Sequence, residues 1–157
     1  MPVTPVSLVE RLKAEGEKCL TFFEALAPAQ WQVEVYEEGG VWTVRSVLAH
    51  FVTAERGFLA LFQNILAGGE GATEDFSIDR YNARQQEKTR DMSPAALLEE
   101  FRAVRTEMVA WVADLTEADL CKEGRHPFLG QTTLAEMIKM VYLHNQIHLR
   151  DLRKCVA

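Results

Sequence analysis

The chain has 157 residues, close to the length of one average domain. Hydrophobic residues make up 48% and charged residues 25%, and nine glycines with five prolines are too few for a disordered or collagen-like chain. The formal net charge of −6 argues against a phosphate-binding surface, because such surfaces concentrate lysine and arginine. We therefore expect one globular domain over residues 1–157 that does not bind nucleic acid.

The cysteines and the apolar stretches bear on localisation. Three widely spaced cysteines form neither a zinc-finger pattern nor a redox CxxC motif, which favours a reducing compartment: Cys19, Cys121 and Cys155. The N-terminal segment lacks the apolar core of a signal peptide. The most apolar stretch, 41–66, is interrupted by charged and polar residues and does not fit a membrane span. We expect a cytoplasmic protein that does not contact membranes.

The first two long helices are predicted by apolar residues that recur at steps of three and four. The first covers 7–27 and ends before Pro28. A connector over 29–42 contains two glycines and at most one extended piece. The second helix begins at Thr43, whose hydroxyl can cap the free backbone amides, and fades near Gly68.

The second half of the chain predicts a short helix and two further long ones. A charged segment over 78–90 forms the short helix, after a loop over 68–77. Ser93 and Pro94 start the third long helix, which runs to about 115, and 116–132 is a loop. Thr133 and Glu136 have capping-box spacing at the start of the last helix. The predicted fold is all-α, a four-helix bundle with a short extra helix between the second and third long helices.

Three of the four histidines lie on the apolar faces of predicted helices. His144 and His148 are four residues apart, so both rings face the same side of the last helix and can reach one metal ion. His50 lies on the apolar stripe of the second helix. If these helices are neighbours, three imidazoles converge and leave a coordination position open, as in catalytic zinc sites; nickel or iron also suit imidazole.

The histidine pattern has alternatives to a three-histidine metal site. Three hydrogen-bonded core histidines would give the same pattern. The sequence after His144 lacks the glutamate of the metalloprotease HExxH motif. The spacing of Glu123 and His126 matches a di-iron element, but it falls in a glycine-containing loop, so we expect His126 at the surface.

Other catalytic motifs are weak or missing. No GxSxG nucleophile elbow is present, and the glycine-rich 68–71 lacks the ending of a phosphate-binding loop. Cys19 is expected to be a small core residue, with a fourth metal ligand or a nucleophile as the alternative.

Two segments resemble a known family. Residues 42–50 read Trp-Thr-Val-Arg-Ser-Val-Leu-Ala-His, which resembles the start of the second helix in the DinB-like (DinB/YfiT) superfamily. The His144-x-x-x-His148 pair resembles the second metal-binding element of that family. The resemblance covers almost the whole chain. It implies a metal-binding bundle with His50, His144 and His148 as ligands, often as a homodimer.

Characterised members of this family include S-transferases that use bacillithiol or mycothiol, and maleylpyruvate isomerases. The resemblance thus implies a divalent metal, zinc or nickel, that activates a low-molecular-weight thiol against a small electrophile. Arg80, Arg84 and Arg150 are candidates for pairing with carboxylates of such a thiol. The segment 79–82 resembles a polar short helix that can border the pocket. One departure is Asp151, where many members have glutamine three residues after the last ligand.

A non-catalytic interpretation remains beside the enzyme. In it the metal only crosslinks two helices of a dimeric module that binds a ligand or a partner. A closed four-coordinate site, with Cys19 or a carboxylate as the fourth ligand, would favour this alternative.

Overall fold

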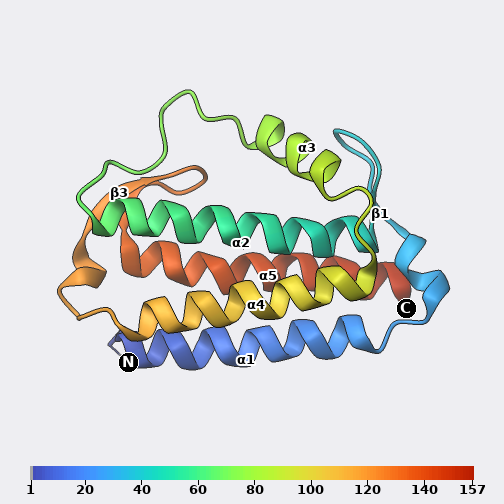
Figure 1. Ribbon diagram of the computed structural model, residues 1–157, viewed down its shortest axis with the longest axis horizontal. Helices are drawn as coiled ribbons and strands as arrows, with labels where there is room; N and C mark the ends of the chain where they lie inside the picture. Colours follow the sequence, from blue (N-terminus) through green and yellow to red (C-terminus); the bar gives the residue numbers. More distant parts are fainter. Residues whose placement is uncertain (1) are drawn as a thin grey trace.

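A computed structural model describes residues 2–157 (Figure 1). The helices are α1 (Pro5–Glu24), α2 (Val44–Leu66), α3 (Ile78–Lys88), α4 (Pro94–Ala113) and α5 (Leu134–Val156), with short 3-10 helices η1 (Pro28–Gln32) and η2 (Asp119–Cys121). Two antiparallel hairpins pair β1 (Glu34–Tyr36) with β2 (Trp42–Thr43) and β3 (Glu123–His126) with β4 (Gly130–Thr133). The predicted all-α bundle with a short extra helix is confirmed.

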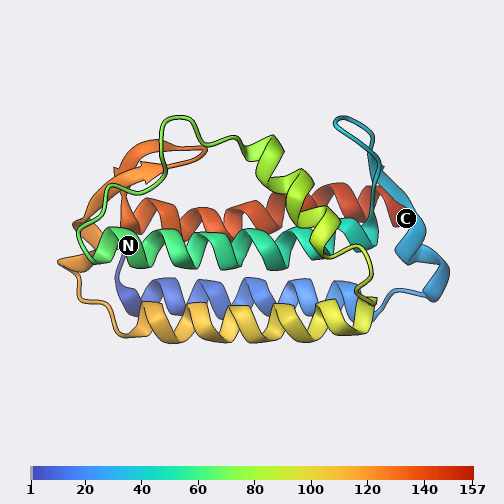
Figure 2. The same cartoon turned by 45° about the horizontal axis from the view of Figure 1, so that its top comes forward.

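The four long helices form two layers. Figure 2 shows α2 and α5 as one layer above α1 and α4, and each helix of one layer contacts one helix of the other. The chain colours in Figure 1 show that α1 and α5 run in one direction and α2 and α4 in the opposite one. The start of α2 therefore lies beside the end of α5, which is the arrangement that the three histidines require.

Side-chain caps fix where the helices begin. The hydroxyls of Thr43, Ser93 and Thr133 each accept a backbone N–H of the following helix, as predicted. The first helix begins earlier than expected, because Thr4 caps it ahead of a proline. At α5 the box is incomplete, since the Glu136 carboxylate contacts a lysine instead.

A buried arginine joins all four long helices. From α4, Arg105 donates from Nε and Nη2 to the Glu55 carboxylate of α2, both at 2.8 Å. Its Nη1 donates to the Leu12 carbonyl of α1 at 2.8 Å, and Nη2 also donates to Asn145 Oδ1 of α5 at 2.5 Å. The carboxylate and these acceptors satisfy a charge that would otherwise be costly to bury. The network holds α2 and α5 side by side.

The short helix α3 is fastened across α2. The Tyr81 hydroxyl donates to the Thr53 carbonyl at 2.9 Å, and Gln86 Nε2 donates to the Ser46 carbonyl at 2.8 Å. Gly57 allows this approach, because a Cβ there would lie 2.7 Å from the Tyr81 hydroxyl oxygen. Together with the segment 67–77 and the β3–β4 hairpin, α3 lies over the α2–α5 layer (Figure 2).

The expected loop over 116–132 is partly wrong. Residues 123–126 and 130–133 form a regular hairpin with His126 opposite Gly130, and Gly130 has a φ of +76° that favours glycine at its turn. The hairpin places His126 inside the molecule at 2% exposure, so the expected surface position was also wrong. No helix in residues 2–157 is long and apolar enough to cross a membrane.

Candidate metal centre

His50, His144 and His148 meet between α2 and α5. His144 Nε2 lies 2.9 Å from His50 Nε2 and 3.1 Å from His148 Nε2. Ligand atoms from the three rings all lie within 4.8 Å of one another, so they can hold one metal ion. The structure thus brings together all three histidines that the sequence singled out. Because α2 and α5 are antiparallel, positions 94 residues apart become neighbours.

Burial keeps the three imidazoles neutral. It lowers the pKa of His50 to about 3, with a further contribution from His148. It also lowers the pKa of His144 well below the ordinary value, and the pKa of His148 is lowered although Asp151 opposes the shift. Neutral imidazoles offer nitrogen lone pairs, which is the form that binds metals.

A hydrogen-bond chain sets the tautomer of His148. The Tyr36 hydroxyl donates to Asp151 Oδ2 at 2.6 Å and lies 2.8 Å from His148 Nδ1. Burial and the hydrogen bond to Asp151 raise the pKa of Tyr36, so it keeps the proton that it donates. Its oxygen then accepts from His148 Nδ1–H, which leaves the Nε2 lone pair facing the other two histidines.

This donor set fits a divalent cation better than it fits hydrogen bonding alone. A proton on His144 Nε2 can donate a well-aligned hydrogen bond to Nε2 of His50 or to Nε2 of His148, but not to both. A single cation would accept lone pairs from all three nitrogens. Among the described residues, no cysteine or carboxylate joins the group. Cys19 therefore does not act as the fourth ligand in this arrangement, and its expected place in the core is confirmed at 0% exposure.

Aromatic rings surround the three histidines. The Trp42 ring centroid lies 5.0 Å from that of His50, and Phe51 lies 6.1 Å from His144 and 5.8 Å from His148. Phe58 meets His144 edge-on at 6.1 Å. Phe51 is buried and closes the inner side of the site, whereas Trp42 and Phe58 also line the cavity on its outer side.

The outer side of the histidines opens into a cavity of about 1010 Å³. Its apolar lining includes Leu61, Phe76, Ile78, Phe128, Met140 and Ile147. The predicted short polar helix borders it through Asp79, Tyr81 and Asn82. By contrast, the candidate arginines lie elsewhere: Arg80, Arg84 and Arg150 are exposed and do not line this cavity.

Sequence reasoning missed two contributors to this region. Tyr36 belongs to a connector without a helical pattern. The only sequence signal for a hairpin there is the pair Gly39-Gly40, which follows Tyr36 and precedes β2. His126 was assigned to the surface, although Pro127 and Gly130 bracket a tight turn that could have indicated a hairpin.

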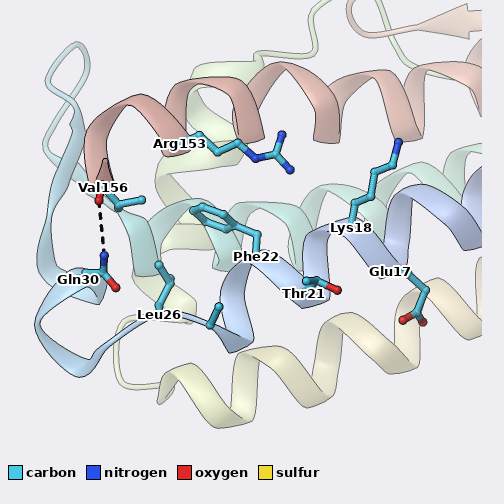
Figure 3. A pocket seen from close by; sticks show the side chains of 9 residues that line it. Glu17, Lys18, Thr21, Phe22, Leu26, Gln30, Arg153 and Val156 are labelled. Atoms are coloured by element: carbon cyan, nitrogen blue, oxygen red, sulfur yellow. Dashed lines mark hydrogen bonds between the residues drawn. The ribbon is translucent and has the colours of Figure 1, made fainter.

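A second cavity lies between α1 and the end of α5. Figure 3 shows its lining side chains, including Lys18, Phe22, Leu26 and Arg153, and the hydrogen bond that Gln30 donates to the Val156 carbonyl at 3.5 Å. It has a volume of about 590 Å³, and none of the four histidines lines it. The metal-ligand set therefore belongs to the larger cavity.

Several solved structures share this fold. YfiT from Bacillus subtilis, described as a probable metal-dependent hydrolase with an unusual four-helix bundle topology, superposes with a TM-score of 0.79 at 18% identity, over 96% of this chain and 85% of that one. A mycothiol-dependent maleylpyruvate isomerase gives 0.80 at 14% identity, and the match covers 97% of this chain but 61% of the isomerase. The colibactin self-resistance protein ClbS, solved with double-stranded DNA, gives 0.75 at 16% identity over 100% and 99% of the two chains.

No functionally curated protein matches the sequence. At these identities the structural similarities establish the fold and leave the activity open. A sequence profile of the DinB superfamily matches residues 11–152, which is nearly the whole chain. The chain belongs to the DinB superfamily.

Proposed function

We propose that this protein is a metal-dependent enzyme in which His50, His144 and His148 bind a divalent ion, zinc or nickel. The observation that carries the proposal is the convergence of three neutral imidazoles, with Nε2 separations of 2.9 and 3.1 Å, at the wall of a large cavity. Similarity in fold to a probable metal-dependent hydrolase and to a mycothiol-dependent isomerase supports it.

The finer proposal is the transfer of a low-molecular-weight thiol to a small electrophile. A divalent ion, when bound, lowers the pKa of a thiol or water placed on it. The three histidines line the cavity, where a thiol could reach the ion, and the buried ring of Phe51 packs against His144 and His148 on the other side. The sulfur would form a bond to the electrophilic carbon, the leaving group would depart with its electron pair, and the thiol proton would pass to solvent.

The chain's own residues would orient the reaction. Tyr36 and Asp151 hold His148 in one tautomer, which keeps its Nε2 directed at the site. The mostly apolar lining would exclude water around the electrophile and favour transfer over hydrolysis.

Elemental analysis of protein purified without a histidine tag tests the metal. We expect about one ion per chain in the wild type and a large loss in His148→Ala. The matched control is His126→Asn, which alters the histidine outside the triad and should keep the ion. An absence of metal in the wild type, even after reloading with zinc or nickel, would overturn the proposal.

A thiol-conjugation assay then tests the reaction. Monochlorobimane serves as the electrophile, with bacillithiol, mycothiol, glutathione and coenzyme A as separate thiols. We expect one thiol to react faster with the wild type than with His148→Ala. A metal-loaded protein that accelerates none of these reactions, yet gains much thermal stability from the metal, would favour the non-catalytic module.

Two partner assignments belong to the same proposal. We expect a homodimer because the resemblance to the DinB-like family implies one, and light scattering after gel filtration would measure it. We do not expect this protein to bind nucleic acid, because its net charge is −6. ClbS, which has a similar fold, was solved in complex with double-stranded DNA. Retardation of double-stranded DNA at 150 mM salt would contradict this exclusion.

A further inference from the structure

The fourth histidine has an unusual hydrogen-bond state. His126 is 2% exposed, and its Nδ1 accepts the backbone N–H groups of Phe128 at 3.0 Å and Leu129 at 3.1 Å. A nitrogen that accepts two N–H groups carries no proton itself. Burial lowers the pKa of His126 to about 4, so the ring is neutral near pH 7. The turn of the β3–β4 hairpin thus places the proton on Nε2.

This Nε2–H lacks an acceptor. It is shielded from solvent and has no hydrogen-bond partner among residues 2–157, where it is the one buried side-chain nitrogen or oxygen in that state. Buried donors are nearly always paired, because an unpaired one costs free energy. The two hairpin amides account for an acceptor at Nδ1, but an asparagine could supply that acceptor without a buried ring N–H that needs a partner of its own. A donor held in one tautomer and left unpaired indicates a role in binding.

The donor belongs to the wall of the candidate active site. The His126 ring lines the large cavity and stacks on Phe58, with centroids 5.3 Å apart and planes at 22°. Phe58 also meets His144 edge-on at 6.1 Å. One aromatic ring therefore separates His126 from the histidine triad. Both His126 and the triad line the cavity, so a molecule bound there would lie against both.

The rest of the lining indicates what this molecule is. No lysine or arginine lines the cavity, and its charged members are Glu38 and Asp79, both acidic. A carboxylate beside His126 would meet a neutral donor and no lysine or arginine, so an anionic group is disfavoured at this end of the cavity. A carbonyl oxygen accepts an N–H bond without bringing charge into an apolar space.

We propose that His126 is a substrate-binding residue whose Nε2–H donates a hydrogen bond to the carbonyl oxygen of a neutral, largely apolar substrate lying between the histidine triad and the β3–β4 hairpin. This inference names the substrate class for the cavity of the proposed function. It requires no metal for its own test.

The test compares two unreactive probes of similar shape, 4-phenylbutan-2-one and butylbenzene, which differ by the carbonyl. Binding is followed by NMR of protein labelled with ¹⁵N-histidine. We expect His126 to show a protonated Nε2 in the free protein, and this nitrogen to shift with the ketone but not with the hydrocarbon. The ketone should bind about tenfold more tightly than butylbenzene, the gain of one hydrogen bond.

Two variants isolate the donor. His126→Asn keeps an acceptor near the Nδ1 position for the hairpin amides and removes the Nε2 donor, so the tenfold preference should disappear. His126→Gln places an amide N–H near the Nε2 position and should restore part of it. An equal preference in the wild type and His126→Asn, no preference for the ketone in the wild type, or a proton on Nδ1 would each overturn the proposal. The wild-type measurements need no variant to fold.

These outcomes separate the inference from the proposed function. Loss of ketone preference in a protein that binds metal and transfers thiol would refute the role of His126 alone. Ketone preference in a protein without metal would support His126 and leave the cavity as a binding site for neutral carbonyl compounds.

Discussion

The hydroxyl of Tyr36 lies 2.6 Å from Asp151 Oδ2 and links that carboxylate to His148 Nδ1. Asp151 stands where many members of the family that the sequence resembles have glutamine. As a stronger acceptor than an amide, the carboxylate holds the Tyr36 proton, and the tyrosine oxygen is left to accept from His148. The departure from the family pattern is thus part of a chain that orients one candidate ligand.

Replacing Tyr36 by phenylalanine should weaken metal binding about 10- to 100-fold, because His148 loses the partner that fixes its tautomer. Competition with a chromophoric chelator measures the affinity. The matched control is Tyr81→Phe, which removes a hydroxyl from the same cavity that is bonded to the Thr53 carbonyl. Equal affinity in Tyr36→Phe and the wild type would show that the chain does not position the ligand.

The buried arginine gives a prediction for stability. Arg105→Met should lower the free energy of unfolding by about 3–5 kcal/mol, because the Glu55 carboxylate stays buried without its partner. The double variant Arg105→Met with Glu55→Met should recover most of this loss. Urea denaturation followed by circular dichroism measures both. Arg102→Met is the control, since its exposed pair with Glu24 should contribute less than about 1 kcal/mol.

The prediction of the bundle from sequence rested on local signals. The caps at Thr43, Ser93 and Thr133 and the apolar periodicity are properties of neighbouring residues, so the long helices could be read directly. The convergence of His50 with His144 followed from helix faces, given that the helices are neighbours. The helix starts depended on single side chains, and the overlooked cap at Thr4 shifted the first start by two residues.

The polar side chains whose positions the sequence did not indicate depend on tertiary contacts. Glu55 is one of the charged residues that interrupt the apolar stretch 41–66, and only its pairing with Arg105 across the core explains its burial. Tyr36 reaches His148 through a hairpin with almost no periodic pattern. His126 looked exposed beside a proline and a glycine, yet the hairpin turns it inward. Glu55, Arg105 and Tyr36 have hydrogen-bond partners far away in the chain, whereas His126 has partners only at Nδ1, within its own hairpin.

The contact between α2 and α3 can be tested at Gly57. A Cβ there would lie 2.7 Å from the Tyr81 hydroxyl oxygen, so Gly57→Ala should displace Tyr81 and cancel the gain of about 1 kcal/mol that alanine brings to a helix. Tyr81→Phe removes this oxygen, so in that background Gly57→Ala should stabilise the protein by about 1 kcal/mol. Thermal unfolding of the four proteins measures the coupling. An equal effect in both backgrounds would mean that α3 is not held at this contact.

Cys19 is predicted to be unreactive in the folded protein. It is fully buried, and burial raises its pKa to about 12, so the thiolate is scarce near pH 8. Titration with Ellman's reagent should modify Cys121 and Cys155 quickly, because both are exposed, and Cys19 only after denaturation. If mass spectrometry shows that the reagent modifies Cys19 rapidly in the folded protein, this prediction is wrong and Cys19 could act as a nucleophile.

The pH dependence of stability should contain a contribution from His126. Burial lowers its pKa from the ordinary 6.5 to about 4 in the folded state. Between these values the unfolded chain binds the proton and the folded chain does not, so stability is full above pH 6.5 and falls as the pH drops toward 4. The loss attributable to His126 should be about 3 kcal/mol. The variant His126→Asn lacks this contribution to the pH dependence of stability, whereas the three triad histidines contribute equally in the wild type and the variant. Urea midpoints of metal-free protein between pH 7 and pH 4 should therefore fall less steeply in the variant, and identical slopes would show that His126 titrates alike in both states.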